Sequence, residues 1–160
     1  MPVDRNAIGV RGEAIVTNLL TRRHGRDDPL FRPHFMGDKY PTIDFFVELV
    51  GAAGSHTPFF LAQVKATASG YTSTGRLRTR VASSEMADLA RYPAPTYIIA
   101  VDEVRELGFL VAALVGGQGQ YRSVPTRYPL AEGATLDELY DEVRSFWTAH
   151  ALEFRRSRFT

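Results

Sequence analysis

The sequence contains no cysteine and only two lysines, Lys39 and Lys65, among nineteen basic residues. Without cysteine the chain has no disulfide framework, no thiolate metal ligand and no thiol nucleophile. No apolar run approaches the roughly 20 residues of a membrane-spanning helix, and residues 1–16 lack the layout of a secretory signal. We therefore expect a cytoplasmic protein without a membrane partner and without thiol redox chemistry.

An excess of charge is lacking as well. Nineteen Lys and Arg residues are balanced by eighteen Asp and Glu residues, which leaves a formal net charge of +1. A nucleic-acid surface would therefore depend on local clusters of basic residues. The 160 residues, 44% hydrophobic and 23% charged, have the composition of one globular domain, so we expect a single domain over residues 1–160.

Hydrophobic periodicity predicts the elements of an α/β fold. The expected helices cover residues 4–24, a short segment capped by Ser83 or Ser84 that ends near 92, and a closing helix that starts with a capping box at Thr135 and Glu138 and reaches 154. The expected strands cover residues 43–50, 59–66, 96–101 and 108–115, and the pattern also allows strands over 31–36 and 121–124. This order predicts a mixed sheet of four to five strands flanked by helices.

Lys65 ends an apolar strand, although arginine supplies almost every other positive charge of the chain. A buried ammonium needs an anionic partner, and the candidates are Asp44 and Glu13. The turn at residues 51–58 predicts that the strands on either side of it pair antiparallel. Strand alternation then places Gln63 and Lys65 on one face, and helical spacing places Glu13 at the edge of an apolar stripe.

These residues resemble a known pattern. Glu13 on an opening helix, Asp44 in an apolar strand and the sequence Gln63-Val64-Lys65 at the end of the next strand are similar to the PD-(D/E)xK nuclease superfamily, especially its Mrr-like branch and domain of unknown function 4365. The resemblance implies a restriction-endonuclease-like core and metal-dependent hydrolysis of nucleic-acid phosphodiesters. It implies a catalytic site at Glu13, Asp44, Gln63 and Lys65, although here an amide, Gln63, stands where the pattern has its second acid.

The chemistry of these residue types is compatible with that implication. Mg²⁺, or Mn²⁺ in its place, takes oxygen ligands, which Asp44, Glu13, the Gln63 side chain and the Val64 backbone carbonyl can supply. Glu48, on the same strand face as Asp44, is another carboxylate that could restore the charge missing at Gln63. Lys65 could orient the attacking water or stabilise the charge on phosphorus, and the sequence leaves both roles open.

Basic clusters could bind nucleic-acid phosphates. The first choice follows the strand that ends near Lys65 and consists of Tyr71, Arg76, Arg78 and Arg80. The other clusters are Arg22, Arg23 and Arg26, and Arg155, Arg156 and Arg158.

Three functions remain open at this point. The first is a nuclease acting on DNA in restriction, defence against mobile elements or repair, as a homodimer if it cuts both strands, with a partner subunit that selects the target. The second is a catalytically degenerate module that keeps the fold and binds nucleic acid or a protein. The third is an unrelated α/β domain, in which Asp44, Gln63 and Lys65 would point apart.

Overall fold

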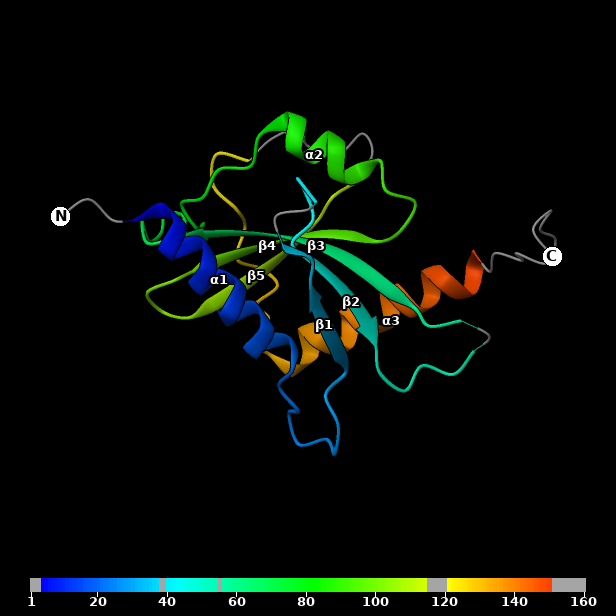
Figure 1. Cartoon of the computed structure of the whole chain (residues 1–160). Coiled ribbons are helices and arrows are strands. Elements are labelled where there is room, and N and C mark those ends of the chain that lie inside the picture. The colour runs from blue at the N-terminus through cyan, green and yellow to red at the C-terminus, as the bar shows by residue number, and fades with distance from the viewer. Residues whose placement is uncertain (1–3, 38–39, 55, 115–120, 151–160) are drawn as a thin grey trace.

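A five-stranded mixed sheet organises the computed structural model, which describes residues 4–37, 40–54, 56–114 and 121–150 (Figure 1). Its strands are β1 (Phe31–Phe35), β2 (Phe45–Leu49), β3 (Phe59–Thr67), β4 (Thr96–Asp102) and β5 (Leu107–Ala112), and they stand side by side in chain order. The helices of the described residues are α1 (Arg5–Leu20), α2 (Ser83–Ala90) and α3 (Gly133–Ala149). The predicted α/β fold, a mixed sheet flanked by helices, is confirmed.

Strand direction follows from the lengths of the connections. β1 and β2, β2 and β3, and β4 and β5 pair antiparallel, whereas β3 and β4 are parallel. A parallel pair needs a long crossover, and residues 68–95 provide it. α2 lies in this crossover and covers one face of the sheet (Figure 1).

The opposite face of the sheet is covered by α1 and α3. α1 begins after Asp4, whose Oδ1 accepts a hydrogen bond of 2.9 Å from the Asn6 N–H. α1 packs tightly on β3 at Gly12, where an added Cβ would lie 2.6 Å from the Cβ of Ala66. This contact requires a glycine. Both helices contribute to one buried cluster, which includes Ile15, Val16, Leu19, Leu20, Leu136, Leu139, Val143 and Trp147.

Strand β3 separates the two cores by alternation. Phe60, Ala62, Val64 and Ala66 belong to the cluster under α1 and α3, whereas Leu61 packs with the cluster under α2. The predicted parity is thus confirmed for these residues, whereas Phe59, which has the parity of Leu61, packs against the cluster of α1 and α3 beside Trp147. Gln63 and Lys65, which have the parity of Leu61, lie on the α2 side.

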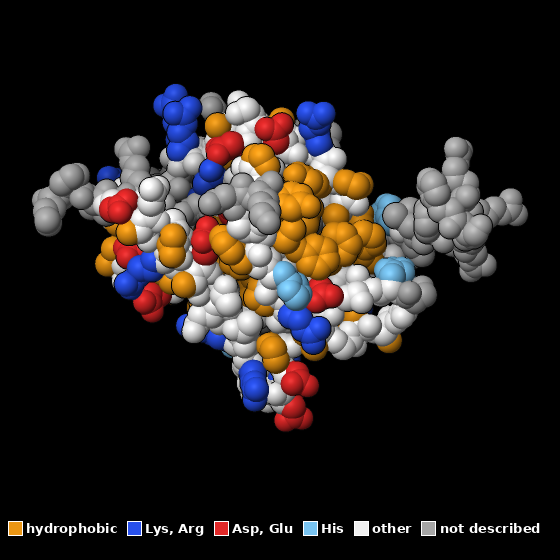
Figure 2. Space-filling model, viewed as in Figure 1, with side chains coloured by type: hydrophobic (Ala, Val, Ile, Leu, Met, Phe, Trp, Pro, Cys, Tyr) orange, Lys and Arg blue, Asp and Glu red, His pale blue; other side chains and the backbone are white. Residues whose placement is uncertain are grey.

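Stacked aromatic rings cover the end of the sheet beside the β2–β3 turn. Phe46 stacks on Phe59 with ring centroids 4.7 Å apart, and the Phe59 centroid lies 4.6 Å from that of Trp147 of α3. The Trp147 Nε1–H also donates a hydrogen bond of 2.7 Å to the Phe59 carbonyl oxygen. Figure 2 shows a patch of hydrophobic side chains on this side of the molecule, below the end of α2. The rings therefore attach α3 to the strand that carries Gln63 and Lys65.

β3 extends past the beginning of β2. The antiparallel pairing ends with Phe45 opposite Ala62, whereas β3 continues beside β4 as far as Thr67. Asp44 stands immediately before β2, level with Gln63. The backbone of residues 63–67 therefore has β4 on one side and extends beyond the end of β2 on the other.

Two predictions about helix starts are wrong. α2 begins at Ser83 after Ala82, so a serine does not cap it; the Glu85 carboxylate accepts a hydrogen bond of 2.8 Å from the Ala82 N–H instead. α3 begins at Gly133, two residues before Thr135, which is buried in the first turn. Burial of Thr135 against the core prevents it from serving as an exposed cap.

The predicted edge strand over residues 121–124 is also wrong. Tyr121 and Val124 form single bridges to Val81 and Leu77, across the α2 side of the fold, and do not extend the sheet beyond β5. The predicted strand 108–115 is shorter and ends at Ala112. The predicted continuation of the closing helix to 154 lies outside the described residues.

Candidate functional site

Asp44 is held between two strands by three hydrogen bonds. Its backbone N–H donates to the Ala62 carbonyl oxygen at 3.0 Å, and its own carbonyl accepts from the Met36 N–H at 2.8 Å. Its side-chain Oδ2 accepts from the Val64 N–H at 2.6 Å. The carboxylate is therefore fixed against the part of β3 that extends past β2.

Gln63 stands level with Asp44, the residue before the neighbouring strand β2, and is buried, with only 6% of its surface exposed. Its Oε1 atom is buried and has no hydrogen-bond partner among the described residues. An unpaired buried carbonyl costs about 1–3 kcal/mol, so native proteins retain one only for a reason. A carbonyl oxygen that is kept unpaired inside a site is suited to ligate a cation.

The Val64 carbonyl points to the same region. Ala62 directs its carbonyl toward Asp44, and Val64 directs its N–H to the Asp44 side chain. Within a strand, residues of one parity turn their backbone groups to the same side. The Val64 carbonyl is therefore directed toward the space past the start of β2, beside Asp44.

Lys65 forms an ion pair with Glu85 of α2. Its Nζ donates to Glu85 Oε1, and the two side chains are 25% and 31% exposed. Burial by itself raises the pKa of Glu85, but the hydrogen bonds from Lys65 and Ala82, with the charges of Lys65 and Arg80, hold that pKa below its ordinary value. Glu85 is therefore a carboxylate that stays ionised at neutral pH.

Glu85 is a residue that sequence reasoning missed. The sequence offers Asp44 and Glu13 as partners for Lys65, whereas the ion pair in the structure joins Lys65 to Glu85. A local signal exists, because Glu85 occupies the third position of a helix, where Glu commonly completes a capping box. That signal indicates a helix start and does not reveal what lies beside it.

Glu13 follows Gly12, the residue at which α1 touches β3. Gly12 packs against Ala66 and Val64, so Glu13 belongs to the helix that covers the face of β3 opposite to Gln63 and Lys65. The Glu13 side chain is partly exposed. Its participation in the site stays a prediction.

Glu48 lies away from the site, although it shares a strand face with Asp44. Its Oε2 is 2.6 Å from His34 Nε2 and 3.8 Å from Arg32 Nη1. Both partners belong to β1, so Glu48 is directed toward the edge of the sheet. The Glu48 carboxylate therefore pairs with Arg32 and His34 and not with the residues around Gln63.

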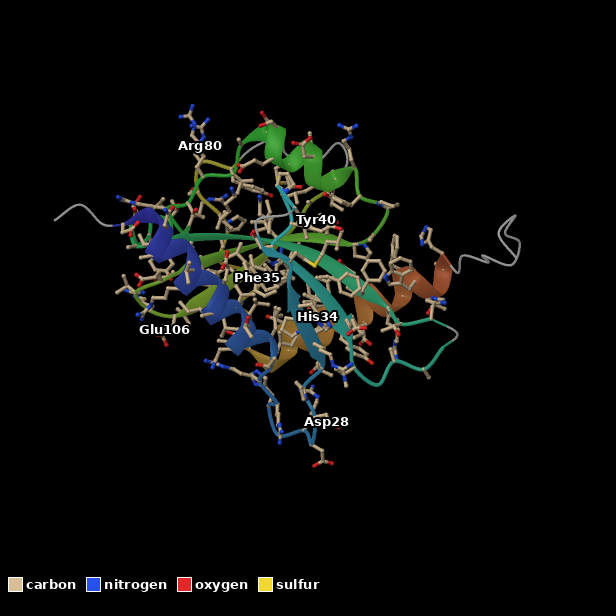
Figure 3. The ribbon with its side chains drawn as sticks, viewed as in Figure 1. Asp28, His34, Phe35, Tyr40, Arg80 and Glu106 are labelled. Carbon is tan, nitrogen blue, oxygen red and sulfur yellow. The ribbon has the colours of Figure 1, made fainter. Side chains whose placement is uncertain are left out.

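The predicted nucleic-acid contacts divide into anchored and exposed residues. The Arg76 guanidinium donates to Ser123 Oγ at 3.1 Å and to the Ser123 carbonyl at 2.6 Å, so Arg76 ties two loops together. Arg78 and Arg80 are exposed, and Arg80 projects into solvent near the start of α2 (Figure 3). Of the three arginines, Arg78 and Arg80 are thus the ones with exposed side chains.

Tyr71 faces the protein rather than the solvent. Its ring centroid lies 5.0 Å from the Arg105 guanidinium carbon, and its ring is edge-on to Phe109, with centroids 6.3 Å apart. Burial and the nearby Asp102 carboxylate raise the pKa of its hydroxyl to about 12. Tyr71 therefore packs within the protein, although its position among arginines in the sequence suggests a contact with substrate.

The remaining basic clusters lie elsewhere. Arg22, Arg23 and Arg26 follow the last turn of α1, and Arg26 pairs with Asp137 of α3. Arg155, Arg156 and Arg158 lie outside the described residues. Arg78 and Arg80 are thus the predicted phosphate contacts that the structure shows exposed on the segment between β3 and α2.

The oxygen donors of Asp44, Gln63 and Val64 are of the chemical kind that a hard divalent cation prefers. Within the described residues, no three His, Cys, Asp or Glu side chains come close enough to hold a metal ion. The available set is one carboxylate from Asp44 and two neutral oxygens, from Gln63 and Val64. Mg²⁺ accepts such a set, since it commonly binds one or two carboxylates and completes its shell with water and substrate phosphate.

Comparison with known proteins adds no family to this description. No family model, no curated protein and no solved structure matches the chain. None of the helices in the described part of the chain has the length and hydropathy that crossing a bilayer requires.

Proposed function

We propose that this protein is a divalent-metal-dependent nuclease that hydrolyses phosphodiester bonds of nucleic acid, with DNA as the expected substrate. One observation carries the proposal. The Gln63 carbonyl oxygen is buried and, among the described residues, unpaired, and Gln63 stands level with Asp44, whose carboxylate accepts the N–H of the next residue, Val64. Gln63 shares its strand face with Lys65. The unrelated-domain alternative expects these side chains to point apart; the register that sets Asp44 level with Gln63, and the face that Gln63 shares with Lys65, support the nuclease instead.

The roles of the oxygen donors follow from their charge and position. When bound, Mg²⁺ would activate a water and neutralise charge on the phosphate. Asp44, Gln63 and Val64 would hold it, and Glu13 is the predicted fourth donor. Because Gln63 is neutral, Asp44 would be the negatively charged ligand among these three. Metal affinity should therefore depend strongly on the Asp44 carboxylate.

Lys65 would act on the reacting phosphate. The Lys65 ammonium, held by Glu85, could donate hydrogen bonds to a phosphate oxygen or orient the water that attacks phosphorus. Both roles need a charged Nζ at a fixed place. Arg78 and Arg80 would attract the nucleic-acid backbone to this side of the protein.

The direct test is cleavage by the purified chain. Supercoiled plasmid, linear duplex, single-stranded DNA and RNA are incubated with Mg²⁺ or Mn²⁺, and we expect cleavage that EDTA abolishes. Lys65→Met should abolish it, whereas Glu48→Gln, on the same sheet face but paired with β1, should retain it. Intact substrates under all these conditions would contradict the nuclease.

A catalytically degenerate binding module is the second candidate. The observation that favours it is the amide at position 63, where the resembling nucleases often carry an acid. This candidate predicts salt-sensitive binding of DNA without cleavage in either metal. Cleavage by Gln63→Glu but not by the natural chain would support it, because one substitution would then have restored the missing charge.

The biological setting is part of the same proposal. We place the protein in the cytoplasm, in restriction, defence against mobile elements or repair. A homodimer would allow both strands of a duplex to be cut, and a partner subunit would select the target. Light scattering with and without a DNA duplex tests the dimer, which predicts two chains per bound duplex.

A further inference from the structure

The ion pair between Lys65 and Glu85 connects the candidate site to α2. Glu85 accepts the Lys65 ammonium with Oε1 and the Ala82 N–H with Oε2, the latter at 2.8 Å. The carboxylate is thus attached to the start of a helix whose Met86 and Leu89 are buried in the core. A carboxylate fixed in this way presents a well-placed partner to the ammonium.

Because residue 63 is neutral, the partner of the Lys65 ammonium must come from elsewhere in the fold. Gln63 and Lys65 lie on the same strand face, about 6.6–6.8 Å apart along the strand. A carboxylate at 63 would be a near partner for the ammonium, but an amide cannot neutralise it. The negative charge beside Lys65 comes instead from α2.

We propose that Glu85 is the positioning residue for Lys65 and performs the task that a carboxylate at position 63 would otherwise perform. It acts through Lys65 and does not itself touch the reacting atoms. A free lysine side chain samples many rotamers, and fixing one costs up to about 2 kcal/mol. The Glu85 contact fixes it before substrate binds. This inference rests on the proposed nuclease function.

Glu85→Gln removes the negative charge of this side chain while preserving the fold. Glutamine at the third helix position can still accept the Ala82 N–H hydrogen bond, so α2 keeps its cap. We expect kcat to fall by about 10–100-fold with KM within about twofold, because outer-shell partners have effects of this size on the group they orient. Glu48→Gln is the matched control, since Glu48 is also ion-paired and partly exposed, and it should leave kcat within about twofold.

The decisive variant places a carboxylate on β3, at position 63, in place of the one removed from Glu85. In Glu85→Gln, the second change Gln63→Glu should restore kcat to within about fivefold of the natural chain, because the new carboxylate at position 63 could then pair with Lys65 from the same strand. Such recovery is a non-additive effect, as expected for residues that share one partner. Additive losses in the double variant would overturn the proposal.

A spectroscopic readout follows the ammonium itself. The chain has only two lysines, so 15N-lysine labelling gives at most two side-chain ammonium signals, and Lys39→Arg assigns them. In EDTA, we expect the Lys65 signal to be visible in the natural chain and lost in Glu85→Gln through exchange with water. A signal that persists in Glu85→Gln would show that another group holds Lys65 and would overturn the proposal.

These outcomes separate the two proposals. Cleavage by the natural chain together with an unchanged kcat in Glu85→Gln overturns the role of Glu85 and leaves the nuclease intact. Failure of both the natural chain and Gln63→Glu to cut any substrate overturns the nuclease, and the positioning role falls with it. Loss of kcat in Glu85→Gln with an unchanged melting temperature and recovery by Gln63→Glu supports both.

Discussion

The Asp44 carboxylate accepts a hydrogen bond of 2.6 Å from the Val64 N–H, in the place where β2 would otherwise have paired with β3. A side chain thus replaces the backbone partner of a strand. This substitution satisfies the backbone of β3 where it leaves the antiparallel pair, and it fixes a negative charge at Val64, between Gln63 and Lys65 in the sequence. Structure and proposed chemistry therefore depend on different properties of the same carboxylate.

Asp44→Asn separates these two properties. Asparagine keeps an oxygen that can accept the Val64 N–H, so we expect the melting temperature to change by no more than about 3 °C. Cleavage should fall by at least about 100-fold, because the neutral amide cannot hold a divalent cation comparably. Circular dichroism and a plasmid assay measure the two effects. Asp44→Ala should also destabilise by about 1–3 kcal/mol, since it leaves the Val64 N–H unpaired.

The Tyr71 hydroxyl gives a pH prediction. Its pKa in the folded protein is about 12, above the ordinary value of 10.0, because burial and Asp102 disfavour the phenolate. A raised pKa favours folding while the hydroxyl is neutral, so this contribution is complete below about pH 10 and is lost as the pH rises toward about 12. Urea unfolding from about pH 8 to about pH 11.5 should therefore show a steeper loss of stability for the natural chain than for Tyr71→Phe. Parallel curves would contradict the assigned environment.

Two glycines of α1 should respond oppositely to alanine. At Gly12 a Cβ would lie 2.6 Å from the Cβ of Ala66, whereas at Gly9 nothing lies within 4 Å. Gly12→Ala should destabilise by about 1–3 kcal/mol, because the helix must move away from β3. Gly9→Ala should stabilise by about 0.5–1 kcal/mol through helix propensity. Equal effects in denaturant unfolding would contradict the close contact between α1 and β3.

Gly12→Ala also tests whether Glu13 belongs to the site. A shift of α1 moves Glu13 relative to β3, so cleavage should fall in Gly12→Ala and fall further in Glu13→Gln. Gly9→Ala should leave cleavage unchanged. Full activity in Glu13→Gln would remove this residue from the predicted ligands.

Local periodicity explains what could be predicted from the sequence. Alternation along β3 places Gln63 and Lys65 on one face, and the turn after β2 places Asp44 near them. Both inferences use spacing within short segments, where geometry repeats every two residues. The position of the aspartate beside Val64 therefore needs no knowledge of the helices.

The parts that sequence reasoning missed depend on contacts between distant segments. Glu85 reaches Lys65 because Met86 and Leu89 fix α2 over the sheet, and no local pattern encodes the path of that crossover. Arg76 is expected at the substrate surface but is bonded to Ser123, which lies 47 residues away. A charged residue in a loop looks alike in sequence whether it faces solvent or joins two loops.

The unpaired carbonyl of Gln63 predicts that its removal increases stability and abolishes activity. Gln63→Leu has a similar volume and removes a buried oxygen that has no hydrogen-bond partner among the described residues, so we expect the metal-free protein to become more stable by about 1 kcal/mol. The same change should abolish cleavage and the rise in melting temperature that Mg²⁺ or Mn²⁺ gives the natural chain. Leu61→Ala, on the same face but among apolar neighbours, should only destabilise. If Gln63→Leu lowers stability in EDTA, the Gln63 carbonyl has a partner within the protein, and the argument for a cation beside Asp44 loses its support.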